Sequence, residues 1–245
     1  VVDDGATDDS AAVAATALAG LAMPARLLRR AHEGAAAAAN AGAQAASGDY
    51  LAFLNADDAF APARIERLVA AIARATPQWG FSRVTDVDDE GREARAADDA
   101  GPRPRNYLGI EPASFTLLDH DVTRSSGNLF VARALFLALG GYRDGAGHRG
   151  WDFCVRAAEH VEPVAVDEAL YVHRVHDGNR VRILANPALR GIDRTAKALL
   201  ADALTREGSV ANVLAPQHAA NRELLRRAEL RAGHGDRVPV AVRRA

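Results

Sequence analysis

Two adjacent carboxylates follow a short apolar run in the first quarter of the chain. The stretch reads Ser47-Gly48-Asp49-Tyr50-Leu51-Ala52-Phe53-Leu54-Asn55-Ala56-Asp57-Asp58. Tyr50 to Leu54 is β-prone and follows a Ser-Gly turn signal, which predicts a buried strand ending at these acids. Ligands of open α/β sheets bind just outside the carboxyl ends of the strands, so Asp57 and Asp58 could hold a divalent cation and, through it, phosphate oxygens. The same pair could instead be a turn that caps the helix expected from Pro62.

The elements around this strand alternate between strand and helix. Apolar residues at helical spacing between positions 62 and 75 predict a helix, with arginines on its other face. Further helices are expected over 11–21, 40–46, 133–139 and 151–160, and strands over 79–84, 128–131, 163–166 and 170–175. This order predicts an α/β fold with a doubly wound, mostly parallel sheet and flanking helices. Residues 86–105 are expected to form a surface loop, because they are rich in Asp, Arg, Gly and Pro and show little periodicity.

Composition narrows the class of protein. The 245 residues are 49% apolar with a formal net charge of -2, which is ordinary for a globular protein and gives no indication of nucleic-acid binding. The single cysteine, Cys154, excludes an internal disulfide and favours a reducing compartment, so we expect a cytoplasmic location. No apolar run reaches the roughly 18 residues needed to span a bilayer.

The residues at both ends of the chain indicate how its domains are organised. Val1-Val2-Asp3-Asp4-Gly5 resembles the end of a strand running into a turn, so we expect a piece of a longer protein whose first strand is missing here. Beyond Asn186 the pattern is purely helical, which predicts an α/β domain over 1–185 and a helical C-terminal extension over 186–245. The arginine excess after Arg222 indicates a solvated helix face, with a peripheral contact to the inner face of the membrane as the alternative.

Four separated segments resemble, in order, the motifs of family 2 glycosyltransferases with the GT-A fold. The first is Val1 to Ser10, similar to the Val-Asp-Asp-Gly-Ser-Thr-Asp opening of that family, and the second is Asn40 through Asp58. The third is Ser126-Gly127-Asn128-Leu129-Phe130 with Leu139-Gly140-Gly141-Tyr142, and the fourth is Trp151-Asp152-Phe153 up to Arg156 with Tyr171-Val172-His173-Arg174-Val175-His176. The resemblance covers about residues 1–185 and implies transfer of a sugar from a nucleoside-diphosphate donor to a glycan, lipid-linked or protein acceptor.

The resemblance implies roles for individual residues. Asp57 and Asp58 would hold Mn²⁺ or Mg²⁺, and His176 would supply a further ligand, since imidazole suits Mn²⁺ better than Mg²⁺. The bound cation would neutralise charge on the departing diphosphate. The nucleotide and donor would be bound by Asp3, Asp4, Asn55, Asp57, Gly127 and Asn128.

Inversion at the anomeric carbon also requires a base for the acceptor hydroxyl. In the family an acid stands six residues before the arginine that matches Arg156, and this chain has Gly150 there. Asp152 is the nearest substitute, with His148 and Asp144 as further alternatives. The missing aligned acid keeps a second hypothesis open, a degenerate GT-A domain that binds nucleotide or glycan or scaffolds a partner. A dinucleotide oxidoreductase is disfavoured because no Gly-x-Gly-x-x-Gly follows a strand.

Overall fold

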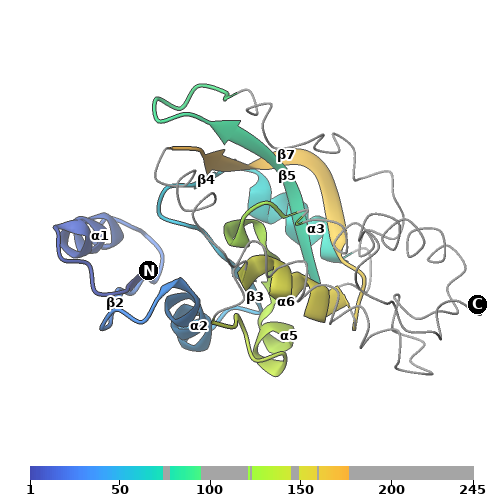
Figure 1. Cartoon of the computed structure of the whole chain (residues 1–245), viewed down its shortest axis with the longest axis horizontal. Coiled ribbons are helices and arrows are strands. Elements are labelled where there is room, and N and C mark those ends of the chain that lie inside the picture. The colour runs from blue at the N-terminus through green and yellow to red at the C-terminus, as the bar shows by residue number, and fades with distance from the viewer. Residues whose placement is uncertain (74–77, 95–120, 122, 145–148, 159, 177–245) are drawn as a thin grey trace, which may run out of the picture.

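Strands and helices alternate along the described part of the chain, as the sequence predicts (Figure 1). The computed structural model describes residues 1–73, 78–94, 121, 123–144, 149–158 and 160–176. The elements are β1 (Val2–Asp3), α1 (Ser10–Ala19), β2 (Leu28–Arg29), α2 (Ala35–Ala45), β3 (Tyr50–Ala52), β4 (Ala59–Phe60), α3 (Arg64–Ala73), β5 (Trp79–Val87), the 3-10 turn η2 (Ser126–Asn128), β6 (Phe130–Ala132), α5 (Arg133–Ala138), α6 (Arg149–Ala158) and β7 (Val164–Arg174). The α/β class is confirmed.

The strands form two sheets of mixed direction. β1 and β2 make a parallel pair, and the larger sheet has the order β3-β6-β5-β7-β4. The long β5–β7 pairing is parallel, whereas β3–β6, β6–β5 and β4–β7 are antiparallel. The expected parallel character therefore holds for the longest pairing but not for every strand, because alternation of helix and strand does not encode the direction in which β6 enters the sheet.

Strand direction brings several polar residues together. β3 and β5 are both antiparallel to β6, and β5 is parallel to β7, so β3, β5 and β7 all run the same way. Their carboxyl ends consequently lie at one edge of the sheet. Four polar residues lie at that edge. They are Asp57 and Asp58 after β3, Asp86 near the end of β5 and His173 near the end of β7.

Helices cover both faces of the larger sheet. The main core packs Trp79, Phe81 and Val131 against residues of α2, α5 and α6, among them Phe136 and Phe153. On the opposite face Leu68 and Ile72 of α3 pack against Phe130 of β6 and the partly buried Val164 and Val166 of β7. The alternation of Val131 and Phe130 between the two clusters follows from the period of two along a strand. Both faces of the sheet are thus covered by packed helices.

Two strand predictions differ from the structure. The strands expected over 163–166 and 170–175 are a single strand, β7, without a turn between them. Its pairing with β5 shifts register between Ser82 and Arg83, where the partner of Ser82 is Val166 and that of Arg83 is Ala169. The polar residues Asp167 and Glu168, between the two expected strands, are extra residues of a β-bulge. Strand β5 extends to Val87, so it includes Asp86, which the sequence placed in a loop.

Several predicted features lie outside the described residues. They are the helical extension over 186–245, the end of the expected first domain after residue 176, most of the loop over 86–105 and the alternative base His148. Among the described helices, none is long and apolar enough to cross a bilayer.

Candidate donor and metal site

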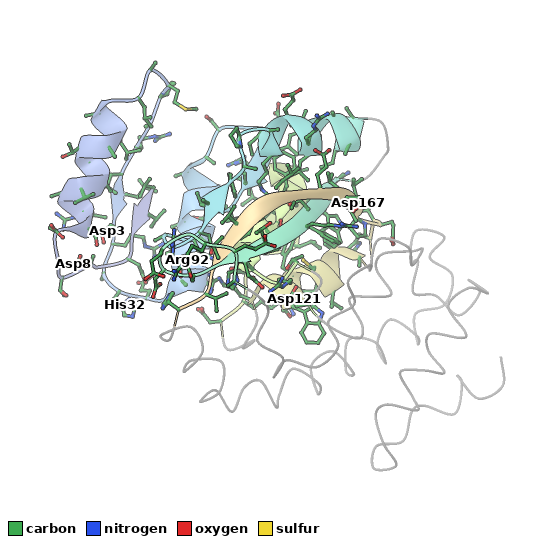
Figure 2. The ribbon with its side chains drawn as sticks, turned by 90° about the horizontal axis from the view of Figure 1, so that it is seen from above. Asp3, Asp8, His32, Arg92, Asp121 and Asp167 are labelled. Carbon is green, nitrogen blue, oxygen red and sulfur yellow. The ribbon has the colours of Figure 1, made fainter. Side chains whose placement is uncertain are left out.

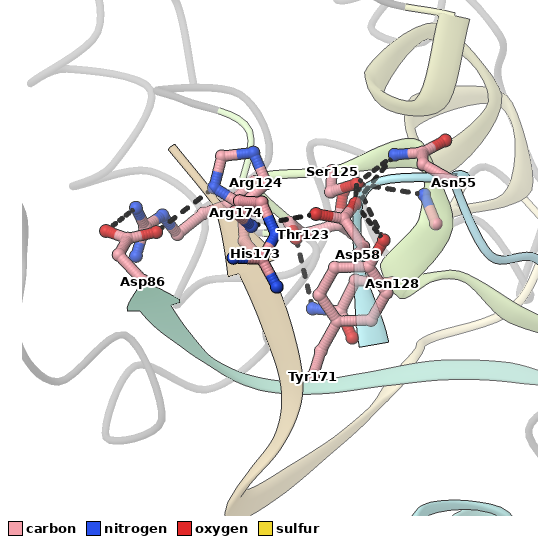
Figure 3. Close-up of polar contacts among 11 residues, drawn as sticks. Asn55, Asp58, Asp86, Thr123, Arg124, Ser125, Asn128, Tyr171, His173 and Arg174 are labelled. Carbon is pink, nitrogen blue, oxygen red and sulfur yellow. Dashed lines mark hydrogen bonds and ion pairs between the residues drawn. The ribbon is translucent and has the colours of Figure 1, made fainter. Parts of the chain in front are cut away.

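Asp58 is the centre of a hydrogen-bonded cluster at the carboxyl edge of the sheet (Figure 3). Its Oδ2 accepts hydrogen bonds from Asn55 Nδ2 at 2.9 Å, from the Tyr171 hydroxyl and, more weakly, from Ser125 Oγ at 3.5 Å. Its Oδ1 accepts from the Arg174 backbone N–H at 3.0 Å. Both carboxylate oxygens therefore accept hydrogen bonds, three at Oδ2 and one at Oδ1. The position of Asp58 lets it fix the turn after β3 to strand β7.

Asp57 and His176 form a pair beside this cluster. His176 Nε2 lies 3.3 Å from Asp57 Oδ2, and both side chains are about one-third exposed, at 33% and 38%. Arg174 Nε donates to the Asp57 carbonyl at 3.2 Å, so β7 holds the backbone of Asp57 as well as the side chain of Asp58. The structure brings together, as predicted, the acid after β3 and the histidine after β7.

The Tyr171 hydroxyl is a donor that the sequence did not assign to the site. Burial raises the pKa of Tyr171 well above its ordinary value, and the hydrogen bond to Asp58 raises it further. The phenol therefore stays protonated and donates to Asp58. Ser125 Oγ lies 3.1 Å from the same hydroxyl. Position 171 belongs to the Tyr-x-x-Arg-x-His segment, so the motif carried a signal for both Tyr171 and Arg174.

Gly127 and Asn128 support this cluster from η2. A Cβ at Gly127 would lie 2.0 Å from the Tyr171 hydroxyl oxygen, so only glycine lets the tyrosine reach Asp58. The Asn128 side chain is fully buried and donates to the carbonyls of Ser82 and Thr123 at 2.8 and 3.0 Å. The Asn128 amide therefore bonds to the protein backbone and helps to hold η2 against β5. Donor binding by Gly127 and Asn128 stays a prediction.

Asn55 joins the cluster to the start of α6. Its Nδ2 donates to Asp58 and to Ser125 Oγ, both at 2.9 Å. Its Oδ1 is 3.5 Å from Arg149 Nη2, at the first residue of α6. Asn55 therefore links three segments, while its role as a donor-binding residue stays a prediction.

Asp3 and Asp4 make their contacts within residues 1–34, the segment that contains β1 and β2. Figure 2 shows this segment at one side of the molecule, with Asp3 and His32 labelled. Asp3 accepts from the Ala6 backbone N–H and from Arg29 Nε. Asp4 accepts from the backbone N–H groups of Glu33 and Gly34, and these bonds lower its pKa. The structure does not bring Asp3 or Asp4 into contact with Asp58 or His176.

Asp152 lies in a separate buried ion pair. Its Oδ2 accepts from Arg156 Nε at 3.0 Å and Nη2 at 2.8 Å, and its side chain is only 5% exposed. Arg156 also donates to the carbonyls of Leu139 and Gly141, so it ties α6 to the end of α5. Arg143 Nη1 lies 4.0 Å from Asp152 Oδ1. Asp144 is exposed, and its role as a base stays a prediction.

Comparison with known proteins places these residues in a family. The model of "Glycosyl transferase family 2" matches residues 1–136, more than half of the chain. Among curated proteins, an uncharacterized glycosyltransferase of Nostoc sp. is 29% identical over 103 residues, which are 42% of this chain and 32% of that protein. The chain thus spans about a third of the length of the curated relative it matches.

Solved structures are similar over nearly the whole chain. TarS 1–349 of S. aureus in complex with UDP-GlcNAc matches with a TM-score of 0.62 at 15% identity, over 94% of this chain and 61% of that one. The mannosyltransferase PcManGT from Pyrobaculum calidifontis, in complex with GDP-Man and Mn²⁺, matches with a TM-score of 0.54 at 20% identity, over 95% of this chain and 70% of that one. Likeness at these identities shows the fold, and the expected GT-A fold is confirmed. With the family model matched over residues 1–136, the chain belongs to glycosyl transferase family 2.

Proposed function

We propose that this chain carries the donor-binding site of an enzyme that transfers a sugar from a nucleoside-diphosphate donor, with inversion, to a glycan, lipid-linked or protein acceptor. The observation that carries the proposal is the Asp57–His176 pair, joined at 3.3 Å across β3 and β7 at the carboxyl edge of the sheet. Family membership and the two relatives solved with nucleotide sugars support the choice of donor. The proposed location is cytoplasmic, with a peripheral contact to the inner membrane face as a secondary expectation.

The donor atoms of the pair fit Mn²⁺ or Mg²⁺ as the cofactor. A carboxylate oxygen and an imidazole nitrogen are both accepted by Mn²⁺, and a carboxylate is also a Mg²⁺ ligand. Among the described residues no group of three or more His, Cys, Asp and Glu is close enough to form a metal cage. Two protein ligands leave the remaining coordination positions for diphosphate oxygens and water. When bound, the cation would supply neutralisation of the charge on the leaving diphosphate.

Asp58 acts in this proposal mainly by position. We predicted it as a metal ligand. Its four hydrogen bonds give it a further role, which is to hold the turn that carries Asp57 at a fixed position relative to β7. Arg174 serves the same end by donating to the Asp57 carbonyl. The protein thereby fixes the cation ligands before the donor arrives, which reduces the cost of ordering them on binding.

The remaining site residues are proposed by resemblance. Asp4, supported by Asp3, would accept a hydrogen bond from the nucleotide base, and Asn55, Gly127 and Asn128 would face the donor. Asp152 is the candidate for the base that the resemblance implies, and only its Oδ1 could act, since Oδ2 is engaged by Arg156.

A second candidate function is a non-catalytic domain that binds nucleotide or glycan or scaffolds a partner. The observation that favours it is the packing of Gly150, where a Cβ would lie 2.8 Å from Ser126 Cα and 3.0 Å from Ser126 Cβ. A side chain at the position of the aligned acid therefore cannot be accommodated without a shift of η2.

The test is donor turnover by the protein with UDP-GlcNAc and with GDP-Man, in Mn²⁺, in Mg²⁺ and in EDTA. We expect release of nucleoside diphosphate that depends on the cation and falls at least 10-fold in Asp57→Asn and in His176→Gln, the scale seen when metal-site residues are lost. Matched controls are Asp49→Asn, at the opposite end of β3, and His160→Gln, on the exposed surface after α6. Equal turnover in all four variants would overturn the site, and binding without turnover in the wild type would favour the second candidate.

A further inference from the structure

A carboxylate and an imidazole face each other at the ends of β5 and β7, outside the residues assigned so far. Asp86 and His173 are directly paired across the parallel strands, and His173 Nδ1 lies 3.1 Å from Asp86 Oδ1. Arg124, in the turn before η2, donates from Nη2 to the other carboxylate oxygen, Oδ2. The side chain of Asp86 is 7% exposed and that of His173 is 21% exposed.

The electrostatics fix the charge of Asp86 and the tautomer of His173. Burial alone would raise the pKa of Asp86, but the hydrogen bonds and charges of His173 and Arg124 lower it to about 2. Asp86 is therefore ionised at neutral pH and can only accept hydrogen bonds, so the proton of a neutral His173 lies on Nδ1. The lone pair of Nε2 is then left to accept a proton. Within the described residues Nε2 makes no hydrogen bond.

The dyad adjoins the proposed donor site. His173 lies two residues after Tyr171 on β7, so its side chain leaves the strand on the same face as the tyrosine that binds Asp58. The next residue, Arg174, donates from its backbone to Asp58 and from Nε to the carbonyl of Asp57. Figure 3 shows His173 between Asp86 with Arg124 on one side and the Asp58 cluster on the other.

Backbone strain points to the same place. Arg124 has φ of +59°, and it is the one residue other than glycine with positive φ in the described part of the chain. Such a conformation costs free energy and persists where the surroundings hold it, commonly near functional sites. Its guanidinium is in turn fixed by Asp86, so this turn and both strand ends are locked together.

The position of the aligned acid and its nearest substitute are less suited to supply the base. Position 150 has no space for a side chain beside Ser126, and Asp152 is buried in its ion pair with Arg156. We propose that His173 is the base that takes the acceptor proton, with Asp86 as the residue that positions it. The inference rests on the proposed function of sugar transfer.

In the proposed step one bond forms and one bond breaks. The acceptor hydroxyl oxygen forms a bond to the anomeric carbon, and its proton passes to His173 Nε2. The bond between the anomeric carbon and the β-phosphate oxygen breaks, and its electron pair leaves with the nucleoside diphosphate. His173 becomes an imidazolium that Asp86 stabilises, as a carboxylate does for the histidine of a hydrolase triad.

The experiment measures turnover of UDP-GlcNAc and of GDP-Man, with water as the acceptor, by His173→Asn, His173→Gln, Asp86→Asn and Asp152→Asn. His160→Gln is the surface control. The asparagine amide replaces Nδ1, so it can still donate to Asp86, but it has no group in place of Nε2. The longer glutamine instead places its amide near the position of Nε2. We expect both His173 variants to lose about 10²- to 10⁴-fold in kcat, the usual contribution of a general base. Binding of Mn²⁺ with nucleoside diphosphate should stay within about twofold of the wild type, because this readout does not use the base.

The pH profile separates a base from a structural contact. At saturating Mn²⁺ the wild type should lose kcat/KM as pH falls, and this acid limb should be absent from the residual activity of His173→Asn. Asp86→Asn should shift the acid limb, whereas Asp152→Asn should keep it. Retention of the limb in both His173 variants, or its loss in Asp152→Asn alone, would overturn the inference and leave the proposed function standing. A wild type that neither binds Mn²⁺ with nucleoside diphosphate nor transfers sugar would overturn the proposed function and, with it, this inference.

Discussion

Asp58 shows how one residue can organise a site through hydrogen bonds from several segments. Its partners come from the turn after β3, the segment before η2 and strand β7, which are far apart in sequence. Hydrogen bonds to a carboxylate are among the stronger ones in proteins, at roughly 1.5–3 kcal/mol each. Their combined effect is to hold the neighbouring Asp57 at a fixed place relative to His176.

Substitution Gly127→Ala tests this organisation at a single atom. The added Cβ would lie 2.0 Å from the Tyr171 hydroxyl oxygen, so the tyrosine must move away from Asp58. We expect a loss of about 1–3 kcal/mol in the free energy of unfolding, as for other overpacked sites, measured by urea denaturation. Gly20→Ala is the matched control, because its Cβ would meet only Ala17 O at 3.7 Å. Equal stability of the two variants would contradict the close contact.

Most residues of the candidate site could be predicted from the sequence, but the contacts between their side chains could not. The pairing of Asp57 with His176 follows from strand order plus two motifs. The four donors to Asp58 depend on side-chain directions from several segments, which no local pattern encodes. Asp86 was misplaced because its surroundings are rich in charged residues, although an acid near the end of a strand is the same signal that identified Asp57.

Strands β5 and β7 are joined by the Asp86 cluster as well as by their backbone bonds. The folded-state pKa of Asp86, about 2, lies below the ordinary carboxyl value near 4. The unfolded chain therefore binds the proton more readily, so stability is kept above pH about 4 and is lost as pH falls from about 4 to about 2.

Asp86→Asn should remove this dependence. The contribution to the free energy of unfolding is on the order of 2 kcal/mol for a shift of this size. Denaturant titrations at several acid pH values should show a steeper decline for the wild type than for Asp86→Asn. Parallel declines would mean that Asp86 is not held ionised in the folded protein.

Helix α6 is anchored by Arg156, whose guanidinium binds Asp152 and the carbonyls of Leu139 and Gly141. Removing one partner of a buried ion pair leaves the other charge uncompensated, so Arg156→Met should cost about 3–5 kcal/mol of unfolding free energy. The double variant Asp152→Leu with Arg156→Met should recover part of that loss, since no buried charge remains. A double variant no more stable than the single one would show that the pair is not the main anchor.

At the scale of the elements, periodicity predicted most helices because their buried faces repeat every three or four residues. The core of α3, with Leu68 and Ile72 fully or nearly buried, is an example. The bulge in β7 was not predictable from Asp167 and Glu168, because polar residues favour turns and bulges alike and only the register with β5 decides between them.

At the scale of the whole molecule, the site exists because β3, β5 and β7 share one direction. A sequence reveals the order of strands, but the antiparallel insertion of β6 between β3 and β5 is a property of the assembled sheet. That insertion leaves the three carboxyl ends on one edge and makes neighbours of residues more than 100 positions apart, as with Asp57 and His176. The α/β class could be predicted from the sequence, but the set of residues that meet at this edge of the sheet could be seen only in the structure.

Binding of Mn²⁺ in the presence of a nucleoside diphosphate tests the central claim most directly. Titrations followed by electron paramagnetic resonance of free Mn²⁺ would use UDP and GDP with the wild type, Asp57→Asn, His176→Gln and the controls Asp49→Asn and His160→Gln. We predict one Mn²⁺ per chain, with affinity at least 10-fold weaker in the Asp57 and His176 variants and unchanged in the controls. Wild-type affinity in both Asp57→Asn and His176→Gln would contradict the account.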